Sequence, residues 1–272
     1  MRKILILTVL FVSIAGIFPA IMQDDADSEA DLSPIIIPDT QAIPLTSTIN
    51  GRDYLLKVAL PASYSTSDQS YPVLYLLDPA ISFQSVTEFV RWLGHWDELP
   101  ELIVVGIGYP SDNIDDMLSV REYDYVRHQD EFIDVISQEI FLLIDSAYRT
   151  DSSDRALVGF SYGGEFALHA LVNRPETFNR YVVIDSGTSE ITRLFTGNLA
   201  DFRERLNGLD VKLFVAHAGN ESAATMNETL IAALQRQNIE GLEASGLYLG
   251  NVTHAAALHL GLPAGIMAIY AE

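Results

Sequence analysis

A single serine surrounded by glycines is the residue of this sequence best suited to chemistry. The segment 157–164 reads LVGFSYGG, so Ser161 stands in a Gly159-x-Ser161-x-Gly163 pattern with Gly164 directly behind it. An apolar run precedes the pattern and a helical segment follows it, which is the context of a sharp strand-to-helix turn that exposes a nucleophilic hydroxyl. Glycines suit such a turn because bulkier side chains would clash there. A chance Gly-x-Ser-x-Gly in an ordinary loop is the alternative interpretation.

A serine hydroxyl needs a base to act as a nucleophile at neutral pH, and the base is usually a histidine oriented by a carboxylate. In sites built on a strand-to-helix turn, the chain order is serine, acid, histidine. His254 follows the last apolar run in a short loop, where such a base belongs, and we predict it as the general base. The other histidines after Ser161 are placed less well: His169 within a helix, His217 too early for this order, and His259 five residues beyond His254.

The acid of the site should follow the apolar run 211–217. Glu221 is the first carboxylate after that run, so we predict it as the acid. Asp185, which follows the run 181–184, is the second candidate, and Asp210 would lie at the wrong end of the sheet. An ordinary exposed glutamate in an acidic protein is the alternative interpretation of Glu221.

Two backbone N–H groups should stabilise the negative charge that develops on the substrate oxygen. One donor normally follows the nucleophile and the other comes from the loop after an earlier strand. That loop is here Leu77-Asp78-Pro79-Ala80, and proline carries no N–H. We therefore predict Tyr162 and Ala80 as the oxyanion donors.

The elements that must position these residues alternate between strand-like and helix-like patterns. Short continuous apolar runs predict strands that are buried on both faces, at 53–60, 73–77, 103–107, 156–158, 181–184, 211–215 and 246–249. Helical spacing lies between them, at 83–93, 130–148, 165–173, 223–237 and 255–270. This alternation predicts an α/β protein with a mostly parallel sheet and helices on both faces. Its active site should lie at the carboxyl ends of the strands.

The N-terminal part of the chain has a different composition. Residues 1–23 combine Arg2 and Lys3 with a long apolar run, which predicts a secretory signal peptide and export to the periplasm or the medium. An uncleaved membrane anchor is the alternative, since the run is almost long enough to span a bilayer. Residues 24–44 begin with an acidic stretch and read as a linker, so we place the folded domain at 45–272.

Composition narrows the possible partners. The formal charge of −21 disfavours nucleic acid and anionic membrane surfaces as ligands. The chain has no cysteine, which excludes disulfides and cysteine nucleophiles, and its histidines have no ligand-like spacing. We therefore expect no metal and no cofactor, and the sequence leaves the oligomeric state open.

Several ordered motifs resemble the putative esterase family of α/β-hydrolases, which includes enterochelin-type siderophore esterases and is related to esterase D. Residues 71–78 (YPVLYLLD) match its YPVLYLLDG, and Arg121-x-x-Asp124-Tyr125 matches its RxxDYTP. The segment 159–164 matches its GHSYGG, and His254 with Gly265 and Ile266 matches its terminal histidine and Gly-Leu spacing. The similarity runs from about residue 45 to the C-terminus. It implies an α/β-hydrolase fold and a serine esterase, with Ser161 as the nucleophile and His254 as its base, and supports Glu221 less firmly.

The chain departs from this family beside the reacting atoms. Pro79 replaces the glycine after LLD, and Phe160 replaces the histidine before the nucleophile. Val126 replaces the proline after RxxDY, and the segment 185–190 lacks the tryptophans of the family's Ser-Pro-Ser-x-Trp-Trp run. Because that run helps to form the pocket, the substrate does not follow from the resemblance.

The expected function is hydrolysis of a small-molecule, lipid or sugar ester through an acyl-enzyme on Ser161. An acyltransferase would use the same residues with an alcohol in place of water. A non-catalytic binding module on a hydrolase scaffold is the third hypothesis, against which the intact Ser161 and His254 argue.

Overall fold

One sheet of eight strands runs through the protein, whose structure here is a computed structural model. The structure describes residues 36–111, 113–187, 197, 199–219 and 231–270, so the predicted signal peptide lies outside the described residues. The strand order is β1-β2-β4-β3-β5-β6-β7-β8. The strands are β1 (Thr40–Thr46), β2 (Asp53–Ala59), β3 (Tyr71–Leu77), β4 (Ile103–Gly108), β5 (Thr150–Phe160), β6 (Arg180–Ile184), β7 (Val211–His217) and β8 (Leu242–Tyr248).

The predicted α/β class with a mostly parallel sheet is confirmed. Strands β4, β3, β5, β6, β7 and β8 pair in parallel, whereas β1 with β2 and β2 with β4 pair antiparallel. All six residues of β4 are buried, and so are the last five residues of β3 and of β5. These are the continuous apolar runs of the sequence, because a central parallel strand is covered on both faces.

The sheet begins before the expected domain start. Strand β1 lies at 40–46, partly within the stretch 24–44 that the sequence predicts as a linker. Among the described strands it pairs only with β2, so it forms one edge of the sheet, with β8 at the other. An edge strand tolerates Pro44, which masks the strand pattern in the sequence.

Helices cover both faces of the sheet. They are α1 (Pro79–His95), α2 (Ile114–Glu122), α3 (Gln129–Val135), α4 (Phe141–Ala147), α5 (Tyr162–Asn173), α7 (Leu199–Leu206) and α9 (His254–Tyr270), with π-helical segments η1 (Tyr123–Arg127) and η2 (Ile136–Ile140). The predicted helix 130–148 is thus one helical run with a π-turn inside it. The predicted helix 223–237 lies partly outside the described residues. Of the described helices, none has the length and apolar character needed to cross a membrane.

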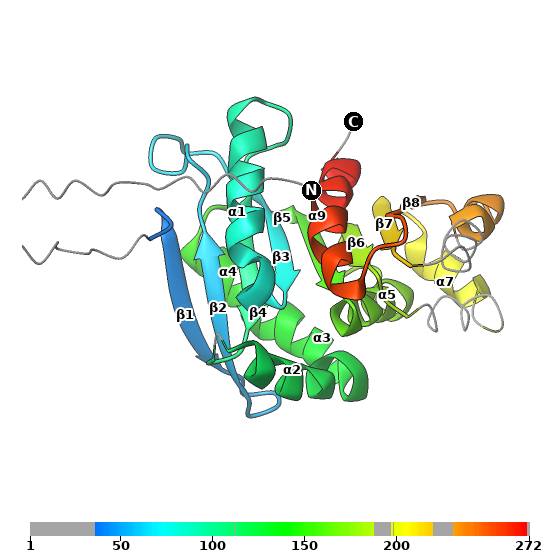
Figure 1. Cartoon of the computed structure of the whole chain (residues 1–272), viewed down its shortest axis with the longest axis horizontal. Helices are drawn as coiled ribbons and strands as arrows, with labels where there is room; N and C mark the ends of the chain where they lie inside the picture. The colour runs from blue at the N-terminus through cyan, green and yellow to red at the C-terminus, as the bar shows by residue number, and fades with distance from the viewer. Residues whose placement is uncertain (1–35, 112, 188–196, 198, 220–230, 271–272) are drawn as a thin grey trace, which may run out of the picture. The chain divides into compact units, whose positions relative to one another are not determined.

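An apolar core lies on each face of the sheet, and the sheet separates the two cores. Helices α1 and α9 lie side by side on one face, where Phe83 and Ile266 pack in the same core as Val182 of the sheet (Figure 1). Helices α3, α4 and α5 pack in the core of the other face, which contains Phe132 and Phe166. Helices therefore cover the central strands on both faces, and the carboxyl ends of the parallel strands lie at one edge of the sheet.

A glycine in α9 sets how closely that helix approaches the sheet. An ideal Cβ on Gly265 would lie 2.4 Å from Cγ1 of Val182 and 3.1 Å from Cδ1 of Phe214. Both neighbours are buried side chains of central strands, so neither can move away freely.

We predict that Gly265→Ala destabilises the protein. Helix propensity alone would stabilise it by about 1 kcal/mol, whereas overpacking of a core costs about 1–3 kcal/mol. We expect a net loss of up to about 2 kcal/mol in the free energy of unfolding, measured by urea denaturation. Leu260→Ala on the exposed side of α9 is the control and should change stability by less than about 0.5 kcal/mol. A Gly265→Ala variant at least as stable as the wild type would contradict this packing argument.

Candidate active site

Ser161 occupies a one-residue turn between β5 and α5. Its backbone has φ 57° and ψ −120°, a region that a side-chain-bearing residue rarely adopts and that costs about 1–3 kcal/mol. Two backbone hydrogen bonds hold the turn: the Ser161 N–H donates to the Ile184 carbonyl at 3.0 Å, and the Glu165 N–H donates to the Ser161 carbonyl at 3.0 Å. The strand-to-helix context expected from the sequence is therefore present.

The glycines around Ser161 do not all have the same role. A Cβ on Gly159 would lie 2.1 Å from the Gly163 carbonyl oxygen, and a Cβ on Gly164 would lie 2.7 Å from the Ser186 Cβ. A Cβ on Gly163 would meet its nearest neighbours at 3.4 Å, which is ordinary contact. Gly159 and Gly164 are thus required by close packing of the turn against itself and against the segment after β6.

His254 and Asp185 form a hydrogen-bonded pair at the same edge of the sheet. His254 is the first residue of α9, and its Nδ1 lies 2.6 Å from Oδ2 of Asp185, directly after β6. Asp185 Oδ1 accepts a hydrogen bond from the Ala218 N–H at 3.0 Å, so both carboxylate oxygens are engaged. Because a carboxylate can only accept, the proton of this hydrogen bond lies on Nδ1 of His254, and in the neutral imidazole Nε2 then carries the lone pair. That is the state a general base requires.

For the acid, the structure describes the second candidate of the sequence but not the first. The structure pairs His254 with Asp185, the second candidate of the sequence, whereas Glu221 lies outside the described residues. The sequence predicts an acid that follows the run 211–217, and Asp185 is only the second candidate because it follows the earlier run 181–184. The signal that points to Asp185 is its position directly at the end of β6, which lies between β5 and β7 in the sheet. Its φ of 45° completes a tight turn there.

Backbone hydrogen bonds connect the loops that carry these side chains. The Asp185 N–H donates to the Ala216 carbonyl at 2.7 Å, and the Leu249 N–H donates to the His217 carbonyl at 2.8 Å. The Gly219 N–H donates to the Gly250 carbonyl at 3.1 Å. The ends of β6, β7 and β8 therefore form one rigid platform below Asp185 and the loop that leads to His254.

His217 lies beneath this pair but does not join it by a hydrogen bond. Its Nδ1 is 3.9 Å from Oδ1 of Asp185, and its buried Nε2 has no hydrogen-bond partner among the described residues. Burial lowers the pKa of His217, and the nearby Asp185 carboxylate opposes that shift. His217 is thus a packed side chain whose charged form is disfavoured by burial, in line with its exclusion as the base.

The two predicted oxyanion donors lie at the starts of neighbouring helices. Ala80 is the second residue of α1, and Tyr162 is the first residue of α5. N–H groups in the first turn of a helix have no acceptor within the helix, and the helix dipole favours negative charge there. Strands β3 and β5, which lead into these helices, pair directly, with Leu76 opposite Val158. Both helices therefore begin at the same edge.

Pro79 is accommodated by glycines of the adjacent strand. A Cβ on Gly106 would lie 2.5 Å from the Pro79 Cβ, and one on Gly108 would lie 2.8 Å from its Cγ. The proline ring therefore packs on the bare backbone of β4. It also begins α1, a position where the missing N–H is no loss.

The second departure from the family pattern, Phe160, contacts the imidazole of His254. The two ring centroids are 4.5 Å apart with planes inclined by 29°, a stacked arrangement. Phe160 is buried, so the ring is a fixed surface against which His254 rests. The phenylalanine that replaces the family's histidine thus keeps an aromatic ring against His254.

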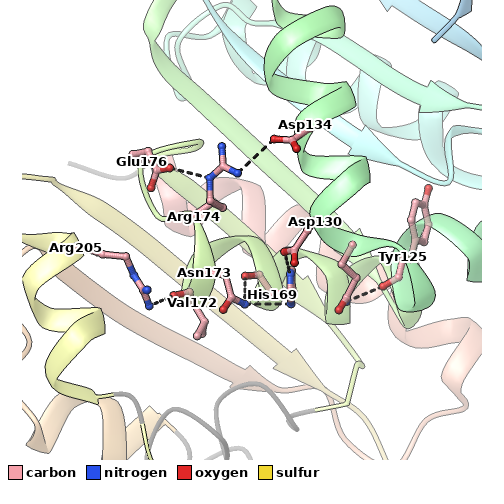
Figure 2. A network of polar contacts seen from close by, with 10 residues as sticks. Tyr125, Asp130, Asp134, His169, Val172, Asn173, Arg174, Glu176 and Arg205 are labelled. Atoms are coloured by element: carbon pink, nitrogen blue, oxygen red, sulfur yellow. Dashed lines mark hydrogen bonds and ion pairs between the residues drawn. The ribbon is translucent and has the colours of Figure 1, made fainter. Parts of the chain in front are cut away.

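The remaining histidines lie outside this constellation. His169 of α5 joins the polar network of Figure 2, where its Nε2 is 2.8 Å from Oδ1 of Asp130 and its Nδ1 is 3.0 Å from Nδ2 of Asn173. In the same network Arg174 bridges Asp134 and Glu176. These contacts tie α5 to α3 and give His169 a structural role.

His259 is exposed on α9, and no cluster of metal-ligating side chains occurs within the part of the chain that the structure describes.

A comparison of sequences shows that this chain is similar to a curated esterase. Ferri-bacillibactin esterase BesA of Bacillus subtilis strain 168 is 28% identical over 169 residues, which cover 54% of this chain and 57% of that protein. The chain thus spans just over half the length of this curated relative.

Solved structures share the fold over more of the chain. The BES protein of Bacillus cereus superimposes with a TM-score of 0.79 at 21% identity, over 90% of this chain and 100% of that chain. An IroE-like serine hydrolase of Shewanella oneidensis gives a TM-score of 0.68 at 25% identity, over 85% of this chain and 80% of that chain.

The family model described as Putative esterase matches residues 47–233, which include the β3–α1 turn, Ser161 and Asp185. This match extends over more than half of the sequence and confirms the resemblance seen in its motifs. The chain belongs to the putative esterase family.

Proposed function

We propose that this protein hydrolyses carboxylic esters through an acyl-enzyme on Ser161. The observation that carries the proposal is the His254–Asp185 pair at the sheet edge where the strained turn holds Ser161. Membership of the putative esterase family supports it. So do the names of the similar proteins, an esterase and a serine hydrolase.

In the first step, Oγ of Ser161 attacks the acyl carbon of the ester. Its proton passes to Nε2 of His254, and the carbonyl oxygen of the substrate takes the negative charge. Asp185 stabilises the imidazolium that forms, because its carboxylate already accepts the proton on Nδ1. The N–H groups of Tyr162 and Ala80 stabilise the oxyanion at the starts of α5 and α1.

In the second step, the tetrahedral intermediate collapses and the ester C–O bond breaks. His254 returns its proton to the departing alcohol oxygen, which leaves an acyl group on Ser161. A water molecule then gives a proton to His254 and attacks the acyl carbon, so that the acid leaves and Ser161 is regenerated.

Siderophore esters are the first substrate class to assay, because two similar proteins are named as siderophore esterases. A screen should combine a triscatecholate siderophore with p-nitrophenyl esters of increasing chain length and acetylated sugars. An added acceptor alcohol in the same assay distinguishes hydrolysis from acyl transfer by the product that forms.

We predict that Ser161→Ala lowers kcat for p-nitrophenyl butyrate by about 10⁴-fold or more, because the acyl-enzyme can no longer form. A fluorophosphonate probe should label the wild-type protein at Ser161 and leave the folded variant unlabelled. A thermal unfolding temperature equal to that of the wild type would show that Ser161→Ala is folded. Turnover or labelling that survives in Ser161→Ala would refute the proposed function.

Asp185→Asn should lower kcat by about 10³–10⁴-fold, because an amide can hold Nδ1 of His254 in the wrong tautomer. The matched variant Glu221→Gln tests the acid expected from the sequence and should retain most of the activity. The opposite result, with Glu221→Gln inactive and Asp185→Asn active, would assign the role to Glu221.

Phe160→Leu should lower kcat by about two- to twelve-fold, which corresponds to the roughly 0.5–1.5 kcal/mol of an aromatic pair. The reason is that leucine removes the ring against which the His254 imidazole is stacked. Phe160→Tyr keeps the ring and should remain within about two-fold of the wild type. Equal kcat values for the leucine and tyrosine variants would show that the stacking does not orient the base.

A further inference from the structure

A buried ion pair lies directly behind the proposed oxyanion site. Arg121, near the end of α2, donates from its Nη1 to Oδ2 of Asp78, and their side chains are only 7% and 1% exposed. Asp78 is the residue between β3 and α1, two positions before Ala80. Burial raises the pKa of Asp78 to about 6, although the Arg121 guanidinium acts in the opposite direction.

The backbone at Asp78 is held in an unusual conformation. With φ 54° and ψ 50°, Asp78 adopts the left-handed helical region, which aspartate and asparagine tolerate better than most residues. This conformation turns the chain from β3 into α1 and thereby determines where the Ala80 N–H points. The Asp78 side chain, paired with Arg121, belongs to the residue at which the chain turns.

The same pair reaches the second oxyanion donor. A Cβ on Gly163 would lie 3.5 Å from Oδ2 of Asp78, so the first turn of α5 packs directly on the carboxylate. The guanidinium carbon of Arg121 lies 5.5 Å from the centre of the Tyr162 ring. One ion pair thus contacts both segments that carry the predicted donors.

The local helical structure brings Arg121 to this place. The helix α2 continues into the π-helical segment η1, which carries Asp124 and Tyr125 of the same motif. Asp124 is itself buried and accepts a hydrogen bond from the Tyr109 hydroxyl at 2.8 Å. This buried anchoring fixes the end of α2 and so the direction of the Arg121 side chain.

Stability alone is a weak reason for this arrangement. Removing two charges from water is costly, and apolar side chains of similar size often stabilise a protein as well or better. A fixed geometry is a better reason, since oxyanion donors act only when they are aligned in advance.

We propose that Arg121 and Asp78 are positioning residues that align the Ala80 and Tyr162 N–H groups for the oxyanion. This inference rests on the proposed function. Neither side chain touches the substrate, so both act through the backbone of the β3–α1 turn and the start of α5.

The test compares Arg121→Lys, Arg121→Met and the double variant Asp78→Asn/Arg121→Met with the wild type. Lysine keeps the charge but loses the planar guanidinium, and the double variant removes both charges while asparagine still suits the left-handed backbone. We expect kcat for p-nitrophenyl butyrate to fall about 10- to 100-fold in each, less than the loss of a whole oxyanion donor. KM should stay within about two-fold, because the donors act mainly on the transition state.

Rates are expressed per active site, titrated with the fluorophosphonate, so that unfolded protein does not lower kcat. Arg180→Lys is the matched control, since Arg180 pairs with Asp154 at 2.7 Å near the other end of the strands. It should lower the thermal unfolding temperature without changing kcat per site.

A kcat per site within two-fold of the wild type in the folded double variant would overturn the positioning role. If Arg121→Lys does not fold, the double variant alone decides, because it leaves no unpaired buried charge. Ser161→Ala is assayed in parallel. Turnover in that variant would refute the proposed function itself, whereas an inactive Ser161→Ala with fully active Arg121 variants would refute only the present inference.

Discussion

The reversal of the chain at one residue, Ser161, is the constraint on which the candidate site depends. Strand β5 passes into helix α5 with only this residue between them, and its backbone adopts a strained conformation. The turn is possible because Gly159 and Gly164 let two backbone segments approach more closely than any Cβ would permit. The surrounding sheet holds the strain through the hydrogen bond from Ser161 to Ile184.

Parallel pairing assembles the other groups around this turn. The register places Phe160 opposite Ile184 and Ile184 opposite Ala216, so the residues that follow these strands lie at one edge. The starts of α1 and α5 lie at the same edge, and N–H groups in the first turn of a helix have no acceptor within the helix. The parallel sheet thus brings together the proposed nucleophile, acid and oxyanion donors, which come from three separate segments of the chain.

The departures from the family pattern are compensated by their neighbours. Pro79 replaces a glycine, and the glycines of β4 provide the space for its ring. Phe160 replaces a histidine, and its ring stacks on the His254 imidazole. The buried Arg121–Asp78 pair lies on the turn that contains Pro79 and contacts the start of α5. Substitutions next to the reacting atoms are thus matched by the residues that pack on them.

The sequence by itself was sufficient for the fold class and the family, and it predicted that Ser161 lies at a strand-to-helix turn and that His254 follows the last strand, because each depends on local pattern and chain order. Apolar runs predict central strands, and glycines around a serine predict a sharp turn. The sequence did not predict strand β1, because Pro44 and one-sided burial weaken the apolar pattern of an edge strand.

Only the tertiary structure decided which carboxylate meets His254 and what lies behind the predicted oxyanion donors. Asp185 and His254 are 69 residues apart, and Asp78 and Arg121 are 43 apart. Neither pairing has a periodic or local signature, since each is created by the register of strands and the packing of helices on them. A hydrogen bond between distant residues depends on the whole path of the chain between them, which no local pattern in the sequence encodes.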